Sequence, residues 1–102
     1  MAKVSMLAKL VVHDGKGDEL IAAFSDLFGQ VEQEPGTEVY VMNRSSSDPN
    51  VFWFYELYSD GAALGAHAGS EAMKNAMGSM GELVASSELI LSTPIQAKGV
   101  AT

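Results

Sequence analysis

The start of the chain alternates between apolar and polar positions. Apolar side chains occupy every second position of the segment from Val4 to Val12, and Ser5 and Lys9 are among the residues between them. This period of two is typical of a β-strand with one buried face. The run His13-Asp14-Gly15-Lys16-Gly17 comes next and predicts a turn.

A helical period follows that turn. Apolar side chains recur at the spacing of an amphipathic helix, at Leu20, Phe24, Leu27, Phe28 and Val31. Asp18 is suited to cap the start of this helix. Glu34-Pro35-Gly36 marks its end, because the residue before a proline is pushed out of the helical region and glycine accommodates a turn. The pattern predicts one helix of about four turns.

Two further segments predict a β-hairpin. Residues 37–44 and 51–58 are rich in β-branched and aromatic side chains, and a polar run containing Asp48-Pro49 separates them. The second strand is largely apolar on both faces. One face carries Val51, Trp53, Tyr55 and Leu57, and the other carries Phe52, Phe54, Glu56 and Tyr58. A sheet with one solvated face does not show this pattern.

The last third of the chain predicts two helices and a strand. Ser59 or Asp60 is suited to cap a short helix that runs through His67, and Ser70 is suited to cap the next one. The apolar stripe of the second helix is Met73, Ala76, Met77, Met80, Leu83 and Val84. Residues 87–100 predict a last strand. Pro94 interrupts its hydrogen-bond ladder and favours an edge, a bulge or an arm that crosses to another subunit.

The predicted order of elements is β-α-β-β-α-β, the ferredoxin-like α+β arrangement with an antiparallel sheet. A length of 102 residues with an even composition predicts a single domain over residues 1–102. Helices cover only one face of such a sheet. The apolar side chains on its other face therefore predict a homodimer that forms through the sheet.

The charge of the chain argues against several classes of partner. There are 13 acidic and 6 basic side chains, a formal charge of -7, and the basic side chains are scattered. We therefore expect binding neither to nucleic acid nor to a membrane surface. The absence of cysteine excludes thiol nucleophiles and disulfides. Neither a signal-peptide pattern nor an apolar run of about 20 residues is present, so a cytoplasmic location is the default expectation.

The segment EPGTEVYVMNRSSSDPNVFWFYELYSDGAALGAHAGSEAMKNAM resembles the antibiotic biosynthesis monooxygenase family. The shared features are a Pro-Gly turn, a strand that contains Tyr40, a hairpin loop with Asp-Pro, a strand that ends in Glu-x-Trp in the family and in Glu-Leu-Tyr here, and a helix with Ala-Leu-x-x-His. The resemblance implies a dimeric α+β barrel with a pocket between sheet and helices in each subunit. It also implies one of several activities: cofactor-free oxidation of quinols or anthrones, haem degradation, or an isomerase-like reaction.

Departures from the family patterns narrow the choice among these activities. Phe54 and Tyr58 stand where actinorhodin-type monooxygenases carry Asn and Trp, and Leu64 stands where they carry Tyr. Met77 stands where the haem-degrading branch carries a histidine, so haem oxygenation is not expected. The sequence also shows neither metal-ligand spacing nor a phosphate-binding loop, and we expect neither a metal nor another cofactor.

His67 is the candidate proton-transfer residue, because imidazole takes and gives protons near neutral pH and the resemblance places it on the pocket side. A helix-fixing hydrogen bond is the alternative role. Glu56 is the candidate partner of His67, or is itself the base. An ion pair at the dimer interface is its alternative role. The alternative role of each candidate for binding a small aromatic substrate is that of a core residue. The candidates are Tyr40, Trp53, Phe54, Tyr58, Leu64, Met73 and Met77.

The function predicted from these residues is a cofactor-independent monooxygenase that acts on a quinol or another electron-rich aromatic molecule. A non-redox isomerase, or a protein that binds a small metabolite in the same pocket, is the second hypothesis. A dimeric module without chemistry is the third.

Overall fold

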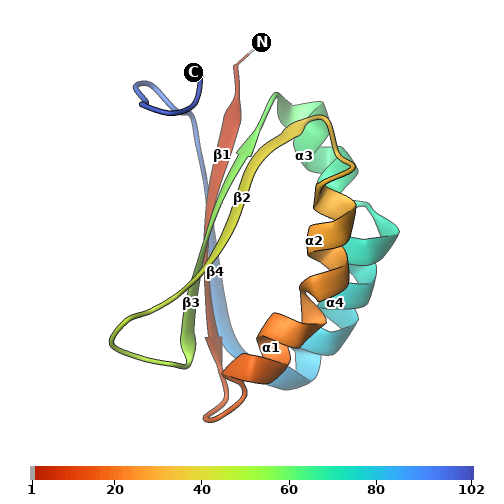
Figure 1. Ribbon diagram of the computed structural model, residues 1–102, viewed down its shortest axis with the longest axis vertical. Helices are drawn as coiled ribbons and strands as arrows, with labels where there is room; N and C mark the ends of the chain where they lie inside the picture. Colours follow the sequence, from red (N-terminus) through yellow and green to blue (C-terminus); the bar gives the residue numbers. More distant parts are fainter. Residues whose placement is uncertain (1) are drawn as a thin grey trace.

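The computed structural model describes residues 2–102 and contains one antiparallel sheet of four strands. The strands are β1 (Val4–Val12), β2 (Thr37–Arg44), β3 (Val51–Tyr58) and β4 (Val84–Ser92), in the spatial order β2-β3-β1-β4 (Figure 1). The two central strands, β1 and β3, pair with each other over most of their length. This arrangement confirms the ferredoxin-like α+β prediction.

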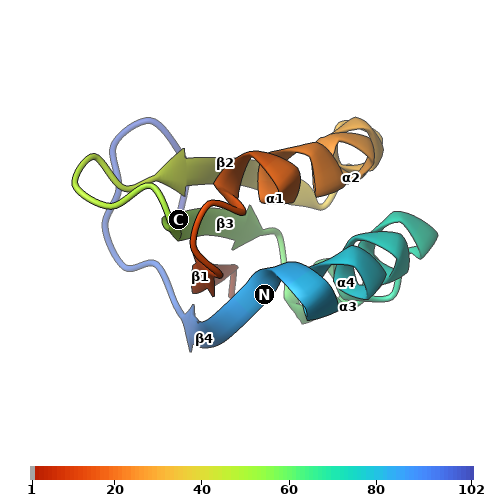
Figure 2. The same cartoon turned by 90° about the horizontal axis from the view of Figure 1, so that it is seen from below.

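Four helices cover one face of the sheet. They are α1 (Gly17–Ala23), α2 (Ser25–Val31), α3 (Gly61–Ala68) and α4 (Glu71–Leu83). Viewed along the strands, the helices form a second layer on the same side, and the chain after β4 lies on the opposite side (Figure 2). The caps of the last two helices agree with prediction. Asp60 accepts a hydrogen bond from the Ala63 N–H at 2.8 Å, and Ser70 accepts one from the Met73 N–H at 3.1 Å.

The first helical segment is two helices rather than one. It begins at Gly17, so Asp18 lies in the first turn and is not the N-cap. The break falls at Phe24, whose backbone N–H is shared between the carbonyls of Leu20 and Ile21. The Ser25 hydroxyl also donates to the Ile21 carbonyl at 3.4 Å. A serine that bonds back to the preceding turn competes with the helical ladder and bends the helix.

The last strand also differs from its predicted limits of residues 87–100. It starts at Val84, directly after α4, and ends at Ser92. Ser92 pairs with Ser5, and β1 starts at Val4, so the register leaves only Thr93 opposite β1 beyond the end of β4. Pro94 lies two residues after the end of β4 and cannot donate a backbone hydrogen bond. Strand β4 is last in the strand order and so is an edge strand, one of the three arrangements that Pro94 favours.

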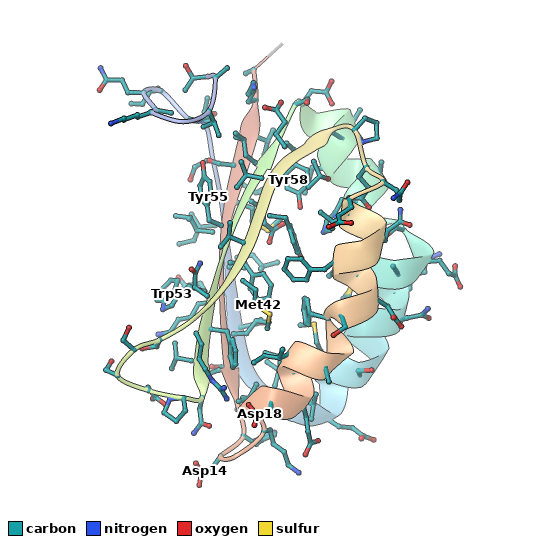
Figure 3. All side chains as sticks on the ribbon, viewed as in Figure 1. Asp14, Asp18, Met42, Trp53, Tyr55 and Tyr58 are labelled. Atoms are coloured by element: carbon teal, nitrogen blue, oxygen red, sulfur yellow. The ribbon has the colours of Figure 1, made fainter. Side chains whose placement is uncertain are left out.

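The core lies between the sheet and the helices. Leu20, Phe24 and Leu27 pack from the helices against Leu10 and Phe54 of the sheet. The alternation predicted for β3 is observed. Phe52, Phe54, Glu56 and Tyr58 are buried on the helix side, whereas Trp53 and Tyr55 point away from the helices (Figure 3). None of the helices within residues 2–102 has both the length and the apolar content that a membrane span needs.

Candidate functional site

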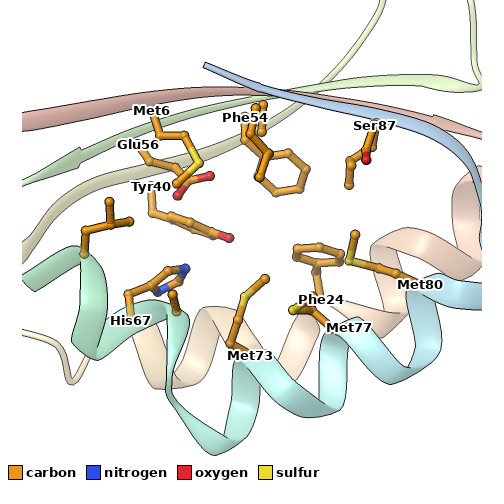
Figure 4. Close-up of a pocket in the computed structure, with 15 residues that line it drawn as sticks. Met6, Phe24, Tyr40, Phe54, Glu56, His67, Met73, Met77, Met80 and Ser87 are labelled. Atoms are coloured by element: carbon orange, nitrogen blue, oxygen red, sulfur yellow. The ribbon is translucent and has the colours of Figure 1, made fainter. Parts of the chain in front are cut away.

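A cavity of about 260 Å³ lies between the sheet and helices α3 and α4 (Figure 4). Its two ends differ in character. Glu56, Tyr40 and His67 gather at one end, and Phe24, Met77 and Met80 lie toward the other. Three ionisable side chains line the cavity: His67, Glu56 and Tyr40. Most of its other lining residues are apolar. The cavity thus joins a polar end to a pliable apolar end.

The strand register explains how the polar end forms. Tyr40 of β2 and Met6 of β1 both pair with Glu56 of β3, so the three side chains emerge from one face of the sheet in a single row. His67 approaches this row from the last turn of α3. Its ring centroid lies 5.0 Å from that of Tyr40 and 5.5 Å from that of Tyr58. The imidazole therefore packs against two phenol rings.

His67 also has a fixed polar partner. Its Nδ1 atom lies 2.9 Å from Oε1 of Glu34, and the His67 side chain is almost fully buried. The same Glu34 oxygen accepts a hydrogen bond from the Thr37 hydroxyl at 2.8 Å, and the other oxygen accepts one from the Gln30 amide at 3.3 Å. Burial opposes ionisation of Glu34, but the hydrogen bonds from Thr37, His67 and Gln30 outweigh it and lower the pKa of Glu34. Glu34 is thus a carboxylate at neutral pH.

An ionised carboxylate can only accept a hydrogen bond, so Nδ1 of His67 donates to Glu34. The imidazole nitrogen that remains is Nε2. Within residues 2–102 no hydrogen bond is made to Nε2, and every fully buried side-chain nitrogen or oxygen has a partner. His67 lines the cavity, so Nε2 is the nitrogen available to a molecule bound there.

Glu56 lies in a different environment. The residue is 5% exposed, and Tyr58 donates a short hydrogen bond to its Oε1 atom. Burial raises the pKa of Glu56, although the hydrogen bond from Tyr58 and the nearby His67 act in the opposite direction. The predicted pairing of Glu56 with His67 is therefore replaced by two pairs, Tyr58 with Glu56 and His67 with Glu34. Glu56 also faces the helices and not the outer face of the sheet.

Tyr40 completes the polar end. Its hydroxyl points into the cavity (Figure 4), and no hydrogen bond joins it to another residue within 2–102. Burial, with the negative charges of Glu56 and Glu34, raises the pKa of Tyr40 well above its ordinary value. The phenol thus stays protonated and can donate a hydrogen bond to a ligand.

The family comparison agrees with this architecture. A model of the family described as antibiotic biosynthesis monooxygenase matches residues 3–79, which is more than half of the chain. The chain belongs to the antibiotic biosynthesis monooxygenase family. No curated protein gives a significant match.

Solved structures of similar proteins support the assignment. A provisionally named antibiotic biosynthesis monooxygenase from Caulobacter crescentus is 30% identical, with 93% of this chain and 92% of that chain covered and a TM-score of 0.87. A protein from Shewanella oneidensis is 28% identical, with 91% of each chain covered and a TM-score of 0.86. Another provisionally named member, from Nitrosomonas europaea, is 18% identical with a TM-score of 0.88 over 96% of this chain and 95% of that one, and it shows the fold alone.

In this family member, most of the residues singled out from the sequence meet in one place. The cavity is lined by His67 and Glu56 together with Tyr40, Phe54, Leu64, Met73 and Met77. Two residues are placed elsewhere. Trp53 lies on the opposite face of the sheet and is 44% exposed. Tyr58 is fully buried and hydrogen-bonded to Glu56, and it does not line the cavity.

Sequence reasoning missed Glu34 as a member of the site. The sequence indicates only that Glu34 precedes the Pro-Gly turn and ends a helix. Its position as the first residue of the segment that resembles the family was the one available signal. Residues 2–102 contain no cluster of three or more His, Cys, Asp or Glu side chains suited to hold a metal ion.

Proposed function

We propose that the protein is a cofactor-independent monooxygenase that oxidises a quinol or another electron-rich aromatic molecule, with His67 as its proton acceptor. The observation that carries the proposal is the cavity itself. It places a buried imidazole with an available Nε2 atom at one end of an otherwise largely apolar space of about 260 Å³. Membership of the antibiotic biosynthesis monooxygenase family gives the reaction class its support.

The chemistry requires a base and exclusion of water. Nε2 of His67 takes the proton of a phenolic O–H or of an activated C–H group, and the resulting anion is electron-rich enough to reduce O₂. At an activated CH₂ group both C–H bonds break and one oxygen atom becomes a carbonyl oxygen, whereas a quinol gains one ring hydroxyl while its two O–H groups become carbonyls. In both cases the substrate gives up four electrons and a net two hydrogens, and the second oxygen atom leaves with these hydrogens as water. The substrate supplies all the electrons for this reduction, so the reaction balances without an external reductant. The apolar walls exclude competing water from the anion.

The other polar residues suit supporting roles. The Tyr40 hydroxyl is a donor aimed into the cavity, where it can stabilise the oxyanion that forms when His67 takes the proton. Glu56 is the second proton-transfer candidate, because burial favours its protonated form and the cavity reaches it. The methionines at the far end, Met73, Met77 and Met80, provide an adaptable surface for the ring system of the substrate.

Oxygen consumption with a panel of quinols and anthrones tests the proposal. We expect uptake of O₂ with at least one compound, and loss of turnover by at least about 10²-fold in His67→Ala. His13→Ala is the matched control, because His13 is the second histidine of the chain and lies exposed in the turn after β1. Retained turnover in His67→Ala would remove the proton-acceptor role.

One observation favours isomerisation as a second candidate. The cavity contains two proton-transfer groups on different elements, His67 on α3 and Glu56 on β3. Such a pair can remove a proton from one atom of a substrate and return it to another without oxygen. Turnover that proceeds equally well under anaerobic conditions would favour the isomerase. Ligand-induced stabilisation without any turnover would favour a binding protein or a module without chemistry.

The proposed assembly is a homodimer that forms through the outer face of the sheet, the face opposite the helices. Cross-strand pairs place four apolar side chains in one row across all the strands of this face: Val41, Tyr55, Leu7 and Ile90. Three of them, Leu7, Val41 and Ile90, are more than 40% exposed in the single chain, as is Trp53 nearby. A second copy of the same face would cover this surface.

A further inference from the structure

We infer that Glu34 is a positioning residue for His67. Glu34 fixes the proton of the His67 imidazole on Nδ1 and so presents the unprotonated Nε2 to the cavity. The role of Nε2 as proton acceptor rests on the proposed function. The proton placement itself does not, because it follows from the contact between Glu34 and His67 alone.

The first argument is the contact. Nδ1 of His67 and Oε1 of Glu34 are 2.9 Å apart, and the two side chains are 4% and 11% exposed. A hydrogen bond to one nitrogen of a histidine determines which tautomer the neutral ring adopts. With an acceptor at Nδ1, the neutral ring carries its proton there, and Nε2 keeps its lone pair.

The second argument is that Glu34 is itself held in place. The Thr37 hydroxyl donates to the same oxygen that His67 contacts, and the Gln30 amide donates to the other. The backbone N–H of Thr37 also donates to the Glu34 carbonyl at 3.1 Å, which closes a turn with Pro35 and Gly36 at its centre. A carboxylate with this many restraints has one orientation.

The third argument is the packing of that turn against α3. A methyl group on Gly36 would lie 2.5 Å from the side chain of Ala63, which is closer than carbon atoms approach. The carbonyl of Gly36 accepts a hydrogen bond from the Ser59 N–H at 2.9 Å. The turn that carries Glu34 thus fits tightly onto the helix that carries His67. The rings of Tyr40 and Tyr58 also pack against the imidazole, and the contact with Glu34 selects the nitrogen that carries the proton.

Nitrogen NMR of the imidazole side chains tests this inference in the full chain, since the two tautomers of neutral histidine give different ¹⁵N shifts. In the unmodified protein we expect neutral His67 to carry its proton on Nδ1, whereas the exposed His13 shows the mixture typical of a free histidine. Glu34→Gln keeps an acceptor oxygen and should keep the Nδ1–H tautomer. Glu34→Ala should lose it, and Glu32→Gln, a charge change at an exposed position of the same segment, should have no effect.

The outcomes separate this inference from the proposed function. An Nε2–H tautomer of His67 in the unmodified protein overturns the role of Glu34, whatever the activity, and does not depend on any variant folding. An Nδ1–H tautomer without turnover on any quinol supports the Glu34 contact and removes the monooxygenase proposal. Where turnover is observed, Glu34→Ala should lower kcat by about 10²-fold with little change in KM, because the base is misplaced and substrate contacts remain.

Discussion

The pKa values of two carboxyl groups near His67, the partly buried Glu34 and the buried Glu56, are shifted in opposite directions by their surroundings. Glu34 accepts hydrogen bonds from three side chains, which overcome the cost of burial and lower its pKa. Glu56 receives one such bond, from Tyr58, and burial prevails and raises its pKa. One acid therefore serves as a permanent acceptor, and the other can hold a proton inside the cavity. This division of roles follows from the number of donors that each carboxyl meets.

The raised pKa of Glu56 predicts a pH-dependent loss of stability. The folded protein holds the Glu56 proton more tightly than the unfolded chain does. Above about pH 4.5, the ordinary pKa of a glutamate side chain, the unfolded state therefore loses this proton first. The stability of the unmodified protein should therefore fall, relative to Glu56→Gln, as the pH rises from there through the folded-state pKa. Urea unfolding of both proteins at a series of pH values measures this difference. Glu71→Gln, at an exposed position, is the control, and a pH-independent difference would contradict the prediction.

Replacing Tyr58 by phenylalanine should destabilise the fold by about 1–3 kcal/mol, because the buried Glu56 carboxyl loses its hydrogen-bond donor. The free energy of unfolding in urea gives the measurement. Tyr55→Phe removes the same hydroxyl from the outer face, where the Tyr55 hydroxyl makes no hydrogen bond within residues 2–102, and should change the stability of the dissociated subunit by less than about 0.5 kcal/mol. Equal losses in the two variants would show that the Tyr58–Glu56 bond contributes nothing.

The sequence predicted which residues meet in the cavity better than it predicted their pairing. The resemblance to the family and the period of two along β3 placed His67 and Glu56 on one side of the sheet. The partner of His67 is Glu34, 33 positions away in the chain, which no local pattern encodes, whereas the partner of Glu56 is Tyr58, two residues along the same strand. The alternation also places Trp53 and Phe54 on opposite faces, so the two neighbours cannot line one cavity.

Element boundaries depend on local competition that an apolar stripe does not show. The spacing of Leu20, Phe24, Leu27 and Val31 is helical throughout, and these residues are indeed buried on one side. The break at Phe24 comes from the hydroxyl of Ser25 and a shared backbone N–H, neither of which affects the apolar period. Strand β4 ends one residue before the position opposite the start of its partner β1, so its limit depends on the pairing as well as on Pro94.

Gly36 controls how closely the turn before β2 approaches α3. Gly36→Ala should destabilise the protein by about 1–3 kcal/mol, because its added methyl group meets the side chain of Ala63 at 2.5 Å. Thermal or urea unfolding measures the loss. The double variant Gly36→Ala/Ala63→Gly removes the opposing methyl group and should recover part of the stability. No recovery would place the cost of the substitution somewhere other than this contact.

Helix α4 contains glycines that weaken it without serving its packing. Gly78 lies in the middle of the helix, and a methyl group added there meets no other atom within 4 Å. Gly78→Ala should therefore stabilise the protein by roughly 0.5–1 kcal/mol through helix propensity and a less flexible unfolded chain. A rise in the midpoint of urea unfolding with unchanged cooperativity is the expected result. A fall would indicate that this surface of α4 is covered in the protein in solution.

At the scale of the whole molecule, the two faces of the sheet differ in what covers them. Helices cover the side of Leu10 and Phe54. On the other side Leu7 and Val41 are more than 40% exposed in the single chain, although Leu57 on the same side is buried. The open side is not uniformly apolar. Lys9 lies over the ring of Trp53, with Nζ 5.3 Å from the ring centroid, and it pairs across the strands with Glu88. A surface that carries both signs of charge beside an apolar row can match a rotated copy of itself.

Substitution in this apolar row tests the homodimer. In a two-fold interface each changed residue occurs twice, so a lysine at Val41 or Ile90 would place two unpaired charges in one contact. We expect the unmodified protein to sediment as a dimer at micromolar concentration, and Val41→Lys or Ile90→Lys to weaken dimerisation by at least about 100-fold, or about 2.8 kcal/mol. Both positions are exposed in the single chain, at 43% and 45%, so the subunit should stay folded.

Ile21→Lys is the matched control, because Ile21 is 42% exposed on α1, on the helix side of the molecule. A well-ordered single subunit of the unmodified protein at that concentration would remove the homodimer proposal, whereas dissociation caused equally by Ile21→Lys would place the interface on the helices.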